Sequence, residues 1–118
     1  MSDHDDLLQI DVERTGTTVR IAARGELDIS TVEALREKTS SELAGDGEIV
    51  VIDLTEVTFI DSSGLQAVLE AAQRAAQRLR VIPSPAATRL FDMVGVADRL
   101  PLTVSRDVGS AHDPGAGA

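Results

Sequence analysis

The sequence predicts an α/β fold, in which a mixed β-sheet of four to five strands opens with a β-hairpin and packs against three to four α-helices. Two observations carry this prediction. First, the alternating apolar segments 7–13 and 18–23 are joined by a Thr-Gly-Thr turn, which is typical of a hairpin. Second, two further apolar segments, 48–54 and 79–82, alternate with segments of helical periodicity.

The first helix is predicted to begin with a capping box, with Ser30 as the N-cap and Glu33 at the third helical position. Its apolar face follows the helical period and consists of Val32, Leu35, Thr39 and Leu43. Gly45 and Gly47 end it.

The last helix is predicted over roughly Pro85 to Val94, because Ser84 is a good N-cap and proline suits the first helical position. Gly95 suits the left-handed residue that stops a helix. We expect Leu90, Phe91 and Val94 to be buried and Met93 to serve in packing. A final edge strand is expected at 100–104, where proline is tolerable.

The central segment begins as a buried strand at Glu48 to Leu54 and crosses a short polar connection. The pair Phe59-Ile60 is expected to return the chain to the core. From Asp61 the pattern changes, and a helix is predicted from about Ser62 to Gln77, with Glu70 and Arg74 as an exposed i,i+4 ion pair. The apolar positions of this helix are Leu65, Val68, Leu69, Ala72 and Ala76.

The junction Asp61-Ser62-Ser63-Gly64 contains more than a helix needs in order to begin. Two hydroxyls lie on the first turn, and a glycine within that turn costs up to about 1 kcal/mol relative to alanine. A small, hydroxyl-rich helix start suggests that another molecule approaches closely, and helix N-termini favour phosphate. The alternative is an ordinary N-cap followed by a second serine.

Composition limits the possible partners. The chain has 118 residues, which is one domain, and its formal charge of −9 disfavours nucleic acid and anionic membrane surfaces as direct partners. A partner with a basic or amphipathic surface fits better, although the charge also serves solubility alone. The absence of cysteine suits a reducing cytoplasm, and the acidic start and the lack of a long apolar run indicate neither a signal peptide nor a membrane span.

The sequence does not predict an enzyme. Its two histidines, His4 and His112, fall in predicted tails, so neither is a credible general base for Ser62. A phosphate-binding glycine loop with lysine is absent, as are Cys and His residues at metal-ligand spacing. We therefore expect no catalytic residue, no metal and no cofactor.

Three blocks in this order carry a family resemblance: Gly25-Glu26-Leu27-Asp28, then the segment 59–65, then Leu90-Phe91-Asp92-Met93-Val94-Gly95. The chain resembles the STAS domains, and specifically the bacterial anti-sigma factor antagonists. The resemblance covers residues 7–104 as a STAS domain, which leaves 1–6 as an N-terminal tail and 105–118 as a disordered C-terminal tail. The D-S-S-G-L block is its most specific part.

The resemblance implies a phosphorylation switch at Ser62, with Ser63 as the local rival. The kinase would be the anti-sigma factor itself, an ATP-dependent serine kinase, and a PP2C-type phosphatase would reset the switch. The unphosphorylated protein would bind that kinase and release the sigma factor, which regulates transcription indirectly. Asp61 and, by the G-E-L-D block, Asp28 would form the environment of the phosphosite or contact the partner, together with Ser63, Gly64 and Leu65. A cytoplasmic protein, monomeric in isolation, is expected.

Other interpretations remain open at this point. For Glu26 and Asp28, the alternative is loop chemistry before a helix. A STAS domain can also be a scaffold or regulatory subunit of a transporter or of a stress-signalling complex, in which case Ser62 would be only a cap. The last alternative is a nucleotide-binding module with weak hydrolysis, in the region near Asp28 and Ser62.

Overall fold

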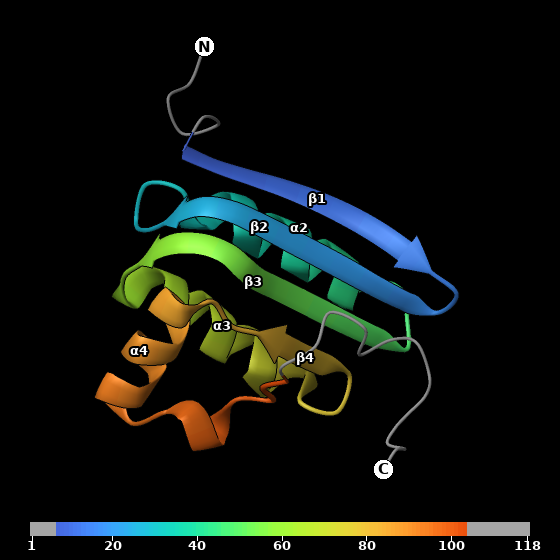
Figure 1. The fold of residues 1–118 in the computed structure, drawn as a ribbon. Helices are drawn as coiled ribbons and strands as arrows, with labels where there is room; N and C mark the ends of the chain where they lie inside the picture. Colours follow the sequence, from blue (N-terminus) through green and yellow to red (C-terminus); the bar gives the residue numbers. More distant parts are fainter. Residues whose placement is uncertain (1–6, 104–118) are drawn as a thin grey trace.

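The computed structural model describes residues 7–103 and confirms the predicted α/β fold (Figure 1). Its elements, in chain order, are β1 (Leu8–Thr15), β2 (Thr18–Leu27), α2 (Val32–Leu43), β3 (Ile49–Ile60), α3 (Ser62–Ala75), β4 (Leu79–Ile82), α4 (Pro85–Val94) and the short 3-10 helix η1 (Ala97–Arg99). The strands form one sheet in the order β1-β2-β3-β4. Within the described residues, no helix is long and apolar enough to cross a membrane.

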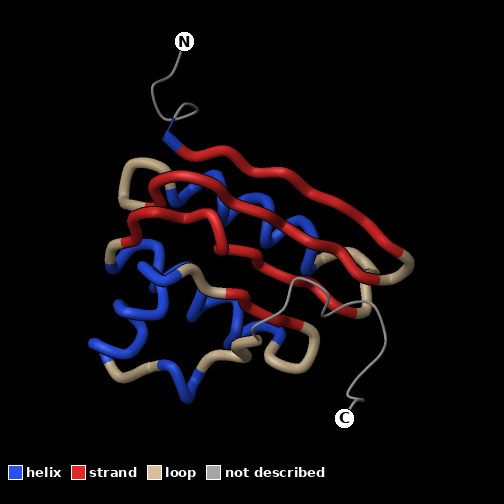
Figure 2. Tube along the Cα trace, viewed as in Figure 1, coloured by secondary structure: helices blue, strands red, loops and turns tan. Residues whose placement is uncertain are grey.

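The sheet is mixed because the chain turns back once and crosses over twice (Figure 2). β1 and β2 pair antiparallel as the predicted hairpin, whose turn contains Gly16 at a φ of 60°. β2 then pairs parallel with β3, and β3 pairs parallel with β4, so that a helix lies in each crossover. The carboxyl ends of β2 and β3 therefore meet at the same edge of the sheet.

The core is mostly aliphatic, since the chain has two phenylalanines and no tryptophan or tyrosine. α2 and α3 lie together on one face of the sheet (Figure 1), and they bury Leu35, Leu65 and Val68 against it. Phe91 of α4 is fully buried and is the largest such side chain. The guanidinium of Arg78 donates hydrogen bonds to the carbonyls of Leu43, Gly45 and Gly47, which fixes the end of α2 beside the start of β4.

β3 is longer than predicted. It runs unbroken from Ile49 to Ile60 through the segment that was expected to be a polar connection. Two register shifts against β2, at Ala22/Arg24 and Gly25/Glu26, absorb the irregularity and let the pairing continue. The prediction that Phe59 enters the core is wrong: its side chain is 50% exposed, because alternation along the strand places it opposite the buried Ile60.

The predicted capping box of the first helix is also wrong. The N-cap of α2 is Thr31, and no side chain caps that helix end. The hydroxyls are used by the preceding loop instead: Thr31 Oγ1 donates to the Glu26 carbonyl at 2.8 Å, and Ser30 Oγ donates to Asp28 Oδ1 at 2.7 Å. These local hydrogen bonds within the loop take the place of a side-chain cap on α2.

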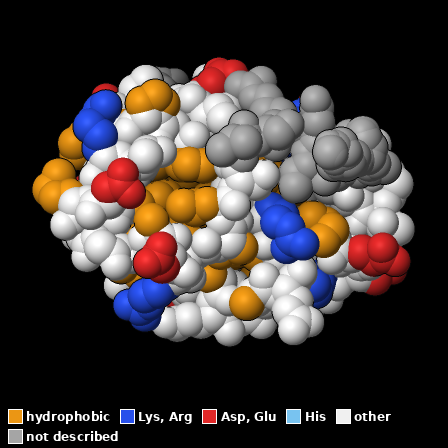
Figure 3. All heavy atoms as spheres, turned by 60° about the horizontal axis from the view of Figure 1, so that its bottom comes forward, with side chains coloured by type: hydrophobic (Ala, Val, Ile, Leu, Met, Phe, Trp, Pro, Cys, Tyr) orange, Lys and Arg blue, Asp and Glu red, His pale blue; other side chains and the backbone are white. Residues whose placement is uncertain are grey.

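The start and stop of α4 are as predicted. Ser84 Oγ accepts a hydrogen bond from Ala87 N at 3.1 Å, Pro85 takes the first position, and Gly95 adopts the left-handed conformation with φ 81°. The expected packing roles of Met93 and Val94 are wrong, since they are 78% and 53% exposed. Apolar side chains are visible on the side of the molecule that carries α4 and η1 (Figure 3).

Two smaller expectations also changed. The expected last strand is reduced to an isolated parallel bridge between Val81 and Leu102, and Val104 lies outside the described residues. Glu70 and Arg74 do not pair with each other in the described structure. Both reach across to α2, where Arg36 Nε donates to Glu70 and Arg74 Nη1 donates to Ser40.

The cap of α4 gives a direct stability prediction. Ser84→Ala should lower the free energy of unfolding by about 1 kcal/mol, because the buried amide of Ala87 loses its acceptor. Urea denaturation followed by circular dichroism measures this difference. Ser41→Ala, at an exposed position within α2, is the control and should change the stability by less than about 0.5 kcal/mol. Equal stability of the two variants would contradict the assigned cap.

Candidate functional site

The candidate site lies where β2 and β3 end side by side. Leu27 and Ile60 are register partners, and Asp61 N donates a hydrogen bond to the Leu27 carbonyl at 3.2 Å. The loop that begins at Asp28 and the helix that begins at Ser62 therefore leave the sheet at the same edge. The structure thus brings together the two segments that the sequence placed in the site.

Asp61, and not a serine, caps α3. Its backbone is extended, and its Oδ1 accepts from Ser63 N at 2.8 Å and from Gly64 N at 3.4 Å. Ser62 occupies the first helical position and is exposed, whereas Ser63 is half-buried. Ser62 is therefore not the N-cap of α3, and within residues 7–103 no hydrogen bond that caps this helix involves its hydroxyl.

Asp28 bonds within its own loop. Its Oδ1 accepts hydrogen bonds from Ser30 N at 3.0 Å and from Ser30 Oγ at 2.7 Å. The bond from the Ser30 hydroxyl is the main reason that the pKa of Asp28 lies below its ordinary value. The carboxylate is therefore ionised at neutral pH and adds negative charge to the edge of the sheet. Among the described residues, no hydrogen bond joins Asp28 to Ser62 or Ser63.

Gly64 and Leu65 pack the first turn of α3 against the interior of the domain. Both are buried, and Leu65 is only 5% exposed. A Cβ built on Gly64 would lie 2.8 Å from Ile60 Cγ1 and 2.8 Å from Leu27 Cγ. The glycine therefore lets the first turn of α3 sit against the ends of β2 and β3. Close packing inside the domain explains this glycine, so it does not by itself indicate an approaching ligand.

Sequence reasoning missed two exposed apolar side chains at this edge, Ile29 and Phe59. Ile29 is 75% exposed in the loop after β2, and Phe59 is half-exposed near the end of β3. Apolar side chains in an otherwise polar, acidic surface are typical of protein interfaces. Strand alternation would have found Phe59, since a strand that buries Ile60 must turn its neighbour to the other face.

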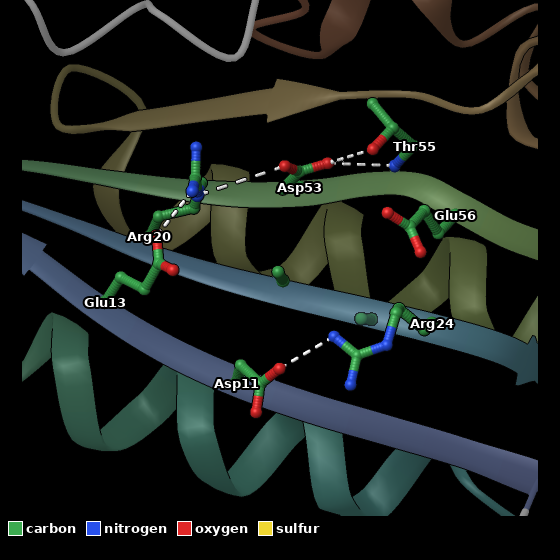
Figure 4. A pocket seen from close by; sticks show the side chains of 9 residues that line it. Asp11, Glu13, Arg20, Arg24, Asp53, Thr55 and Glu56 are labelled. Atoms are coloured by element: carbon green, nitrogen blue, oxygen red, sulfur yellow. Dashed lines mark hydrogen bonds and ion pairs between the residues drawn. The ribbon is translucent and has the colours of Figure 1, made fainter.

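A second polar cluster lies on the face of the sheet opposite α2 and α3 (Figure 4). Asp53 of β3 is 4% exposed; its Oδ1 accepts from Thr55 N at 3.0 Å and from Thr55 Oγ1 at 2.7 Å, and its Oδ2 lies 4.0 Å from Arg20 Nε. Arg20 also pairs with Glu13, and Arg24 with Asp11. These ion pairs connect β1, β2 and β3. The sequence signal for this cluster was a single aspartate within an aliphatic strand.

The described residues offer little for catalysis or metal binding. Within residues 7–103, no group of three or more His, Asp or Glu side chains is placed to hold a metal ion. His4 and His112 lie outside the described residues. What the edge does present is one exposed hydroxyl on a helix start, flanked by two carboxylates and two exposed apolar side chains. That arrangement suits modification and protein docking.

The close packing at Gly64 gives a stability prediction. Gly64→Ala should destabilise the protein by about 1–3 kcal/mol, because the added methyl group overlaps Ile60 and Leu27 by more than the helix propensity of alanine can offset. Thermal and urea unfolding measure the loss. Gly45→Ala is the control, since its Cβ would meet nothing closer than 3.4 Å. A Gly64→Ala protein as stable as wild type would show that the helix start is not tightly seated.

Comparisons with known proteins agree with this geometry. The family model described as "Mlab, STAS domain" matches residues 10–104. The anti-sigma-B factor antagonist of Listeria monocytogenes is 31% identical over 90 residues, which cover 73% of this chain and 79% of that protein.

Solved structures of such antagonists are similar as well. The crystal structure of an anti-sigma factor antagonist from Mycobacterium paratuberculosis has a TM-score of 0.79 at 25% identity, over 87% of this chain and 91% of that one. The anti-sigma factor antagonist SpoIIAA in its unphosphorylated form gives 0.65 at 26% identity, over 84% and 90%. The phosphorylated form of the Bacillus cell fate determinant SpoIIAA gives 0.61 at 27%, over 84% and 93%. This chain belongs to the STAS domain family, among the bacterial anti-sigma factor antagonists.

Proposed function

We propose that phosphorylation of Ser62 controls the binding of this antagonist to an anti-sigma factor. The observation that carries the proposal is the exposed hydroxyl of Ser62 on the first turn of α3, in a helix start whose cap is supplied by Asp61. A kinase can reach such a hydroxyl, and its modification removes no hydrogen bond that holds the helix. The fold can therefore tolerate both states.

Ser62 suits this role better than Ser63. The backbone amide of Ser63 holds the Asp61 carboxylate at 2.8 Å, and the residue is half-buried. The amide of Ser62 is not one of those that bond to Asp61, and the residue is exposed. A phosphate on Ser63 would have to displace the cap or press on the packed turn, whereas a phosphate on Ser62 projects from the edge.

The added phosphate changes the charge of the edge without requiring a new fold. It carries about −1.5 to −2 charges at neutral pH. Asp61 already occupies the amides of Ser63 and Gly64, so the helix end offers the phosphate fewer donors than an uncapped helix would. Repulsion by Asp61 then directs the phosphate outward, where a partner would dock. Each 1.4 kcal/mol of unfavourable contact weakens binding about tenfold.

The same edge supplies a docking surface. Ile29 and Phe59 are exposed apolar side chains on the two segments that flank Ser62, and Asp28 and Asp61 add acidic groups. A partner with an apolar centre and basic residues at its rim would complement this surface. The unphosphorylated form would bind such a partner, and a phosphate at its centre would exclude it.

The family supplies the identity of the partners. By resemblance, the kinase is the anti-sigma factor itself, binding of the unphosphorylated antagonist releases the sigma factor, and a PP2C-type phosphatase restores the binding form. The relative SpoIIAA is described in both an unphosphorylated and a phosphorylated form, which supports a two-state protein. In this proposal the chain is a substrate and ligand of its partners, and it regulates transcription without contacting nucleic acid.

Capture from a lysate of the source bacterium tests the switch. Immobilised wild type and Ser62→Ala should retain a kinase-like anti-sigma factor, and Ser62→Asp should lose it, with binding weakened at least roughly tenfold by the added charge. Intact mass measured on the bound and unbound pools should place the phosphorylated form in the unbound pool. Ser63→Ala, which leaves Ser62 in place, should still be phosphorylated. Equal recovery by the Ser62→Ala and Ser62→Asp forms would refute the proposal and favour a scaffold role.

The docking surface has its own test. Phe59→Ser should weaken binding to the captured anti-sigma factor about tenfold or more, because an aromatic side chain that becomes buried at an interface contributes more than 1.4 kcal/mol. Calorimetry with the purified partner measures this. Leu102→Ser is the matched control: it also removes an exposed apolar side chain, but it lies beside Val81, far along the sheet from the Ser62 edge. Equal affinities for the two variants would place the interface elsewhere.

A further inference from the structure

We propose that the groove between α2 and α3 binds a small oxyanion, such as a phosphate group. The groove is lined by residues of α2 and α3, the two helices that cover one face of the sheet, and Ser62 is not among these residues. Its cavity volume is about 80 Å³, which suits a single phosphate-sized group. This site is independent of the switch proposed above.

Two arginines cross the groove in opposite directions. Arg36 of α2 reaches α3, where its Nε donates to Glu70 Oε1 at 3.2 Å. Arg74 of α3 reaches α2, where its Nη1 donates to Ser40 Oγ at 3.0 Å. Each guanidinium has five N–H donors in a planar fork, so both retain donors beyond these bonds. An anion between them could receive hydrogen bonds from both helices.

The charge of the groove favours an anion. Its lining contains the cations Arg36 and Arg74 and one carboxylate, Glu70, so the lining residues carry one net positive charge in a chain of formal charge −9. Arg36 is balanced by Glu70 and by Glu33 at 3.8 Å. Arg74 forms no ion pair with any residue of the range 7–103, and its charge is the one available to a ligand.

A buried hydroxyl independently indicates a missing partner. Thr39 lines the same groove, is 5% exposed, and its Oγ1 has no hydrogen-bond partner within the described part of the chain. A threonine in a helix usually bonds the carbonyl one turn earlier, and leaving a buried hydroxyl unsatisfied is unfavourable. The oxygen itself is buried in this conformation, so an oxyanion between the arginines would become its acceptor once the Thr39 side chain turns toward the groove.

These donors select the ligand by chemistry. Two guanidinium forks and a hydroxyl match the several acceptor oxygens of a phosphate group better than they match a neutral ligand. The small side chains of Ala67 and Ala71 form the rest of the lining and leave room for the group. The same chemistry could come from free phosphate or from a phosphorylated side chain, which the experiment separates.

Titration of the full-length protein with inorganic phosphate tests the site. At a constant ionic strength of about 0.15 M, where charges more than about 8 Å apart are largely screened, the amide NMR signals of Thr39, Ser40 and Ala71 should shift saturably. Arg74→Gln should weaken the apparent affinity at least about tenfold, because it removes the unbalanced charge. A parallel titration with phosphoserine identifies the source: tighter binding than inorganic phosphate indicates a phosphorylated side chain, and equal binding indicates the free ion.

Two further variants make the result decisive. Arg89→Gln makes the same change of charge on the exposed side of α4 and should leave the affinity unchanged. Thr39→Val removes the hydroxyl with little change in shape, and it should weaken phosphate binding without lowering the melting temperature of the ligand-free protein, since no hydrogen bond is lost. Signals that drift without saturating, or an Arg74→Gln protein that binds as well as wild type, would overturn the proposal.

Discussion

The parallel pairing of β2 with β3 is the constraint on which the rest of this structure depends. It aligns Leu27 with Ile60, so the two segments that follow β2 and β3 leave the sheet at the same edge. The amide of Asp61 donates a hydrogen bond to the carbonyl of Leu27. Because Gly64 has no side chain, the first turn of α3 can then rest on Leu27 and Ile60. The position of Ser62 follows from these contacts.

The proposed modification of Ser62 requires a helix start that holds without the Ser62 hydroxyl. Asp61 satisfies the amides of the first turn, and the buried Leu65 anchors that turn in the core. Within residues 7–103, no hydrogen bond that caps the helix involves the Ser62 hydroxyl, so under this proposal a charge added there would act on the surroundings of the helix and leave its cap in place. A helix capped by Ser62 itself would have coupled modification to fraying of its own end.

Charge is distributed unevenly over this acidic molecule. The Ser62 edge combines the carboxylates of Asp28 and Asp61 with exposed Ile29 and Phe59, which suits a protein partner with a basic rim. On the face of the sheet opposite α2 and α3, ion pairs connect β1, β2 and β3, and one of them involves the buried Asp53 (Figure 4). The residues that line the groove between α2 and α3 carry one net positive charge.

The sequence by itself determined the fold class, the hairpin, the α4 cap at Ser84 and the helix start at Ser62, because these features depend on short-range periodicity and on local capping chemistry. Only the tertiary structure decided what depends on long-range pairing. The register with β2 continues β3 through its polar residues, and alternation along this longer strand then turns Phe59 outward. In the β2–α2 loop, Ser30 Oγ donates to Asp28 Oδ1 instead of serving the expected capping box, and Thr31 Oγ1 donates to the Glu26 carbonyl. Gly64 was visible as an oddity in the sequence, but its reason, two side chains 2.8 Å from an absent Cβ, exists only when strands far apart in the chain are brought together.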